Sequence, residues 1–303
     1  MKRATFSSAK RKKVADGVSG ALFVAPLCIG LLLFLAFPLV YAFVISFTDY
    51  QMNAPELMKF VWFDNYVRAF QDDWFLSGLR NALINAIGVP IGMFCALLLS
   101  TFILRIKKGG TLFKVLLYVP TVCSAVAITF IWQWMFQGEY GLLNRMLVAI
   151  GLPKVSFLNR HNFWGSMIFM GVWSGLGTSI LLFYAQLKNI PHQLYEAAMV
   201  DGANAFQSFI HITVPGVSPV SFYILLTGIA GSFQDFTRFQ VMTGDSMQEW
   251  NVMPVWYIYK FTSVDYGYRL GYASAMGIIL GVILIAISLI QFFVSKYWVH
   301  YDS

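Results

Sequence analysis

Six long apolar stretches dominate the pattern of hydrophobic and polar positions, and the charged residues fall between or beyond them. None of the six contains Lys, Arg, Asp or Glu. Their bounds are Ala21 to Phe47, Leu83 to Phe102, Val115 to Phe136, Phe163 to Leu187, Val217 to Phe233 and Gly271 to Phe293. Each meets or approaches the roughly 20 apolar residues that a helix needs to cross a bilayer. Periodicity alone does not separate such a run from a buried soluble helix, but six in one chain favour an all-α integral membrane protein with six transmembrane helices.

Composition supports this fold class independently. Hydrophobic residues make up 58% of the chain and charged residues 12%, whereas a soluble domain carries about 25% charged residues. The mean hydropathy is +0.66. We therefore interpret the sequence against a membrane rather than against water.

The distribution of Lys and Arg predicts the orientation of the helices. The leading segment 1–20 has six basic residues and only Asp16 as an acid, and the turn after the second stretch has four basic residues and no acid. With these segments inside, the four inner segments hold 12 basic and 4 acidic residues, and the three outer segments hold 9 and 10. We expect both termini in the cytoplasm of a bacterial-type cell, with 1–20 and 294–303 as cytoplasmic tails.

The net charge of +7 does not indicate a nucleic-acid partner, because the basic residues cluster beside the apolar stretches, as topology and contact with anionic lipid require. The first stretch, 21–47, is also too long for the h-region of a secretory signal, which is about 7 to 15 residues. We expect it to remain as the first transmembrane helix.

Neither catalytic nor metal-binding residues stand out. The three cysteines lie inside predicted spans, and the four histidines are scattered without ligand spacing. The sequence has no GxxxxGK[ST] phosphate cradle. We therefore expect a non-enzymatic chain that binds no cofactor or metal itself.

A polar segment between the fourth and fifth stretches carries the most specific pattern. Glu196-Ala197-Ala198 is followed after three residues by Gly202, and nine residues later by Ile212-Thr213-Val214-Pro215. Pro191 favours a helix start, and Gly202 favours a helix end. We predict two short helices, the second from about Asn204 to Ile212, with Phe206, Phe209 and Ile210 on one face and Pro215 separating it from the fifth span.

This pattern resembles the EAA loop of type I ABC importer permeases, and every place of the family's spacing is satisfied. We call residues 188–216 the EAA segment. The resemblance implies that it lies within a transmembrane core of five helices, which spans residues 76–293. The resemblance implies that this segment is a lever that transmits the motion of an ATPase subunit. Its exposed aromatic side chains would fill a groove of that subunit, and Glu196 would lie near a basic residue of the groove. The alternative is an amphipathic loop that merely covers the inner face of the bundle. The residues implied in coupling are Glu196, Ala197, Ala198, Asp201, Gly202, Phe206, Ile212 and Pro215.

The resemblance also implies the partners. In the family, two permease chains sit above two ATPase chains that bind ATP and Mg, and a solute-binding protein delivers the solute. The EAA pattern occurs once in this sequence, so a second permease is needed, which in sugar importers is usually a paralogue.

Polar and aromatic residues within spans are candidates for the solute path, because they are costly in lipid unless they face the bundle interior or water. In maltose-type permeases, which this chain resembles, the residues closing the helix after the EAA loop contact the sugar. The candidate path residues are Trp173, Ser174, Gly175, Gly228, Gly231, Ser232, Gln234 and Asp235. For any one of them, anchoring at the membrane interface or hydrogen bonding between helices is an equal alternative.

An uncharged sugar or oligosaccharide is the expected solute. An anion such as glycerol phosphate would favour Arg or Lys in the path, and Arg238 is only the nearest basic residue outside a span. An ion-driven secondary transporter would show charged residues within spans or an internal repeat, and neither is visible.

Overall fold

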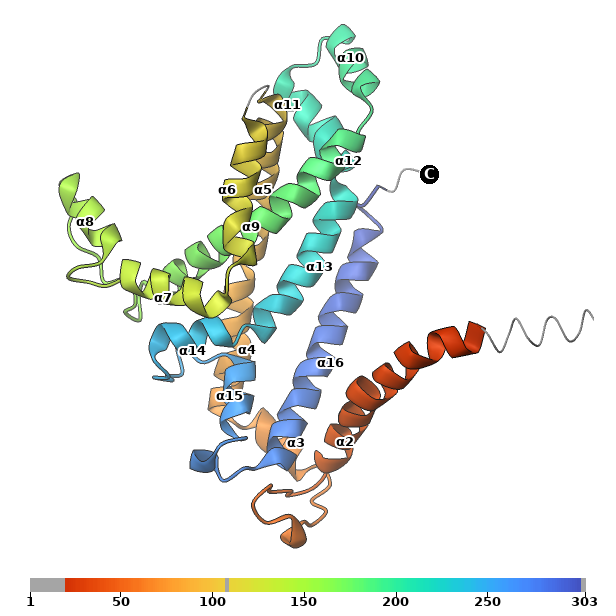
Figure 1. Ribbon diagram of the computed structural model, residues 1–303, viewed down its shortest axis with the longest axis vertical. Helices are drawn as coiled ribbons and strands as arrows, with labels where there is room; N and C mark the ends of the chain where they lie inside the picture. The colour runs from red at the N-terminus through yellow and green to blue at the C-terminus, as the bar shows by residue number, and fades with distance from the viewer. Residues whose placement is uncertain (1–19, 107–108, 301–303) are drawn as a thin grey trace, which may run out of the picture.

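The computed structural model describes residues 20–106 and 109–300 and is a bundle of long helices (Figure 1). Within these described ranges, four helices are long and apolar enough to cross a membrane: Gly20–Ile45, Asp73–Arg105, Phe163–Asn189 and Leu270–Ser295. Two further pairs of helices pass the same test together but are sharply bent at short breaks. Six spans result if each bent pair counts as one. Most of the predicted basic tail, together with Lys107 and Lys108, lies outside the described residues.

The long helices are assembled from the following elements. The first helix contains the π-helical turn η1 (Leu32–Ala36) and α2 (Phe37–Ile45); the second joins α4 (Asp73–Ala86) and α5 (Gly88–Arg105); α9 (Phe163–Asn189) and α16 (Leu270–Ser295) are the third and fourth. The bent pairs comprise α6 (Gly110–Val122) with α7 (Ala125–Met135), and α11 (Ala205–Ser208), η3 (Phe209–Thr213) and α12 (Val214–Gly216) with α13 (Ser218–Gln234). Shorter elements are η2 (Pro55–Leu57), α3 (Asp64–Phe70), α8 (Leu142–Ala149), α10 (His192–Val200), α14 (Thr237–Thr243), α15 (Pro254–Lys260) and η4 (Val264–Tyr266).

Two predicted spans differ from the structure. The second begins at Asp73, ten residues before the predicted Leu83, because the Asp72 carboxylate caps the helix by accepting hydrogen bonds from the backbone N–H groups of Trp74 and Phe75. The third is not one straight helix, since α6 and α7 meet at 100°. Pro120 removes a backbone donor near the end of α6, and Cys123 and Ser124 are extended.

Packing within the bundle depends on close approach of α5, α6 and α9. A Cβ atom added to Gly177 of α9 would lie 2.6 Å from the Leu117 carbonyl oxygen of α6. Gly88 and Gly92 of α5 face Ile168 and Val172 of α9. These small residues therefore serve helix contacts inside the bundle.

At the end of the bundle away from α10, the Asp72 carboxylate links three helices. Asp72 accepts hydrogen bonds from the Tyr257 hydroxyl at 2.9 Å and the Tyr272 hydroxyl at 2.7 Å, which joins α4 to α15 and α16. Burial and the neighbouring Asp72 raise the pKa of Tyr257 well above its usual range, so this phenol stays a donor.

Candidate coupling and translocation sites

The EAA segment projects from one end of the bundle as a helix–turn–helix (Figure 1). Its first helix, α10, is followed by Gly202, which has φ +80°. This backbone conformation is unfavourable for any residue with a Cβ atom. The Gly202 N–H donates to the Met199 carbonyl at 3.1 Å and the Ala203 N–H to the Ala198 carbonyl at 2.9 Å. These two bonds form a Schellman motif, which closes the helix and turns the chain.

The N-cap residue of the second short helix, Asn204, lies two residues after Gly202. The Asn204 side chain accepts from the Gln207 N–H at 2.9 Å, and the Gln207 side chain accepts from the Asn204 N–H at 2.8 Å. This capping box satisfies two donors at the helix start. The C-terminal motif of one helix thus runs directly into the N-terminal cap of the next, and the turn has little conformational freedom.

The two short helices enclose a shallow recess of about 310 Å³. Ala198, Asp201, Gly202 and Ile212, four of the predicted coupling residues, line it. Glu196 and Ala197 are exposed on α10; the Glu196 carboxylate lies 3.0 Å from His192 Nδ1, in a pair that is open to solvent on both sides.

The aromatic face of the second helix is only partly as predicted. The Phe206 side chain is 72% exposed. Phe209, however, packs against the buried cluster around Phe183, and it lines an apolar groove together with Ile210, whereas Phe206 does not. Because the chain winds as a π-helix from Phe209 onward, the expected single face is divided.

Pro215 does not separate this helix from the fifth span, contrary to the prediction. It occupies the first turn of α12, where proline is tolerated, and the 63° bend falls between Gly216 and Ser218. Val217 at the bend is 1% exposed. The Gln186 side chain of α9 donates to the Gly216 carbonyl at 3.0 Å, which fixes the bend against the bundle.

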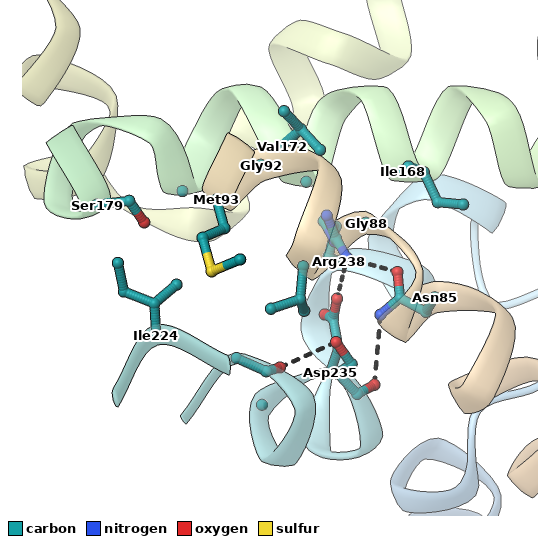
Figure 2. Close-up of a pocket in the computed structure, with 16 residues that line it drawn as sticks. Asn85, Gly88, Gly92, Met93, Ile168, Val172, Ser179, Ile224, Asp235 and Arg238 are labelled. Carbon is teal, nitrogen blue, oxygen red and sulfur yellow. Dashed lines mark hydrogen bonds and ion pairs between the residues drawn. The ribbon is translucent and has the colours of Figure 1, made fainter. Parts of the chain in front are cut away.

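A cavity of about 240 Å³ lies between α5, α9 and α13 (Figure 2). Five predicted path residues line it: Gly175, Gly228, Gly231, Ser232 and Asp235. The other three are absent from its lining. The Trp173 ring packs edge-to-face on Trp132, the Ser174 hydroxyl donates to the Met170 carbonyl, and Gln234 is exposed at the last position of α13.

Glycines determine the shape of this cavity. A Cβ atom on Gly175 or Gly231 would meet no atom within 4 Å, so both leave open space. A Cβ atom on Gly228 would instead lie 2.6 Å from Val89 Cγ1. Gly228 therefore permits contact between α13 and α5, which explains the small residue there.

The polar end of the cavity contains an arginine that the sequence placed outside the path. Arg238, from the first turn of α14, pairs with Asp235 and donates to Asn85 Oδ1 at 3.2 Å and the Met167 carbonyl at 3.3 Å. Asn85 in turn donates to the Ser232 carbonyl at 3.3 Å. Figure 2 shows Arg238, Asp235 and Asn85 together at one end, with Met93, Ile224 and Ser179 at the other. The expectation that no basic residue lines this region is wrong, because α14 folds back beside the end of α13.

Comparison with known proteins places these features in a family. The sequence profile of the family described as binding-protein-dependent transport system inner membrane component matches residues 88–298. The probable ABC transporter permease protein YesP of Bacillus subtilis is 32% identical over 294 residues, which cover 95% of this chain and 94% of the relative. The arabinooligosaccharides transport system permease protein AraP of the same organism is 31% identical over 278 residues, covering 89% and 86%.

A solved structure shows the same fold. It belongs to a bacterial ABC transporter involved in the import of the acidic polysaccharide alginate, with a TM-score of 0.79, 24% identity, and coverage of 97% of this chain and 99% of that chain. The all-α membrane fold predicted from the sequence is confirmed, as is the resemblance based on the EAA segment.

Proposed function

Because this chain belongs to the family of binding-protein-dependent transport system inner membrane components, we propose that it is one permease subunit of an ATP-driven sugar importer. With a second permease chain it forms the path for a sugar or oligosaccharide, which a solute-binding protein delivers from outside. Separate ATPase subunits, which bind ATP and Mg, open and close the path by alternating access.

The observation that carries this proposal is the continuity between the EAA segment and the cavity. The segment passes through the buried bend at Val217 into α13. The far end of α13 leads to Asp235 at the polar end of the cavity. A displacement of the exposed helices is therefore transmitted by a single helix to the place where a solute would bind.

We assign the docking of an ATPase to the exposed surface of α10 and α11. Phe206 offers an exposed aromatic side chain, Glu196 offers a charge, and the turn between the helices is rigid enough to act as a lever. Both termini lie on this cytoplasmic side in the proposal. The backbone N–H of His300, near the C-terminus, donates to Ser218 Oγ at 2.9 Å, which supports that side for the C-terminal tail.

A sugar is favoured over a phosphorylated solute. Relatives carry the names arabinooligosaccharides transport system permease protein and diacetylchitobiose uptake system permease protein, at 31% and 30% identity. A relative named sn-glycerol-3-phosphate transport system permease protein is 28% identical and matches 77% of this chain. The charged residues lining the cavity, Asp235 and Arg238, also balance one another and leave no net positive charge for a phosphate.

The test is ATP hydrolysis by the complete complex in proteoliposomes. The permease pair and the ATPase subunits are reconstituted, and the solute-binding protein is added with arabinooligosaccharides, diacetylchitobiose or glycerol 3-phosphate. We expect hydrolysis and uptake to rise with one of the sugars. Stimulation by glycerol 3-phosphate alone would refute the sugar assignment. If none of the three solutes stimulates hydrolysis in the presence of the binding protein, the assignment as an importer subunit is refuted.

A further inference from the structure

Arg238 and Asp235 form an ion pair in the wall of the cavity, and they are the charged residues among those that line it. Their side chains are 15% and 20% exposed, so the pair is mostly removed from water yet reaches the cavity. Charges in such a position act strongly on a ligand, because there is little solvent to screen them.

The arginine is held from three sides. It donates to Asn85 of α4 and to the Met167 carbonyl of α9, and it pairs with Asp235 just beyond α13. Its guanidinium lies directly over Gly171, where any Cβ atom would collide with Nη1. Its position is therefore determined by α4, α9 and the α13–α14 turn together.

The aspartate is left with an available acceptor. Oδ2 pairs with Arg238, and the structure records no hydrogen bond to Oδ1 from the described residues. An oxygen in this setting accepts a hydrogen bond from a solute hydroxyl, provided that the carboxylate is charged and held in place. The Ser232 hydroxyl does not compete, because it donates to the Gly228 carbonyl at 3.0 Å.

From these contacts we propose that the Asp235–Arg238 pair determines the charge specificity of the cavity: because Asp235 neutralises Arg238, the cavity selects uncharged polyhydroxylated solutes over carboxylated ones. Without Arg238 the cavity would hold an unpaired carboxylate, which repels an anionic solute. Without the charge of Asp235 it would hold an unpaired guanidinium, which binds a carboxylate bidentately. This inference rests on the proposed sugar path.

The experiment measures equilibrium binding of sugars to the purified permease–ATPase complex in nanodiscs, without ATP and without the solute-binding protein. The probes are arabinobiose and diacetylchitobiose, each compared with its derivative in which one primary alcohol is oxidised to a carboxylate. The variants are D235N, R238Q and the double variant D235N/R238Q. The matched controls are D245N and K260Q, because the Asp245–Lys260 pair lies outside the cavity lining.

We expect the wild type to prefer the neutral probe. D235N should shift the ratio of carboxylated to neutral binding upward by about tenfold, R238Q should lower it, and the double variant should return it close to the wild-type ratio. The controls should leave it unchanged. A merely structural role for Arg238 would weaken binding of both probes equally and would not produce opposite shifts.

Several outcomes overturn the inference. One is a wild type that binds the carboxylated probe more tightly, and another is an equal ratio in all three variants with assembled complexes. If R238Q fails to assemble, R238K keeps the charge and is expected to keep the wild-type ratio, so a changed ratio there also overturns it. If the wild type binds neither neutral probe, the sugar assignment itself fails, which is distinct from sugar binding with an unaltered ratio.

Discussion

The EAA segment and the cavity are built by different kinds of contacts. The turn between α10 and α11 is closed by hydrogen bonds between residues at most five positions apart, such as Ala203 to Ala198. The polar end of the cavity joins Arg238 to Asn85 across 153 positions and Asn85 to Ser232 across 147. The first geometry is specified locally, and the second exists only when the whole bundle is assembled.

The two regions also differ in exposure, which separates the consequences of mutation. Side chains on α10 and α11 reach solvent, so we expect substitutions there to affect the proposed docking of an ATPase with little loss of stability. Residues around the cavity contact neighbouring helices, so we expect most substitutions there to affect both helix packing and the proposed solute path. Glycines with open space around them are the exception that allows the path to be tested alone.

The largest effect is expected from Gly202→Val. A β-branched residue at φ +80° is strained by about 1–2 kcal/mol, which would open the turn and release α11 from α10. We expect sugar-stimulated ATP hydrolysis to fall more than tenfold while the spans still insert. Gly151 is the matched control, since it also has φ +80° and open surroundings. Equal losses for Gly151→Val would mean that strain in general, rather than this turn, is responsible.

Next in size is Gly231→Leu, which tests the cavity without breaking the bundle. Its new side chain would enter open space, and leucine favours a helix by roughly 1 kcal/mol over glycine. We expect uptake to fall about tenfold with unchanged thermal stability, because cavity volume is lost. Gly165→Leu on α9 also meets open space but lies outside the cavity lining. Normal uptake by Gly231→Leu would exclude this cavity as the path.

The same contrast explains what the sequence could predict. The existence of most long helices and the turn at Gly202 follow from apolar length, proline and glycine, which act over a few residues. The bend between α6 and α7 was missed because Pro120 sits within an apolar run that satisfies the length criterion. Arg238 was missed because its place depends on α14 folding back to Asn85 and Met167. The exclusion of Trp173 from the lining depends likewise on its contact with Trp132.

A smaller effect is expected from Phe206→Ala. The side chain is 72% exposed, so its loss costs the folded permease little. Aromatic anchors at interfaces contribute about 1–2 kcal/mol or more, and we expect the affinity for the ATPase subunits to fall up to about tenfold. Val264→Ala is the control, since Val264 is equally exposed, at 71%, but lies in η4, outside the EAA segment. Unchanged assembly of Phe206→Ala would remove this residue from the docking surface.

The smallest effect is expected from Glu196→Lys. The Glu196–His192 pair is exposed on both sides, and such pairs contribute at most about 1 kcal/mol to stability. The loss of this pair alone should therefore leave the melting temperature nearly unchanged. Charge reversal should still reduce coupled ATP hydrolysis about threefold if the carboxylate faces a basic residue of the ATPase.

His192→Gln removes the same pair but keeps the carboxylate, so it should behave as the wild type. If both variants lose coupling equally, the pair within α10 matters rather than the contact with the ATPase, and the lever would depend on Gly202 and Phe206 alone.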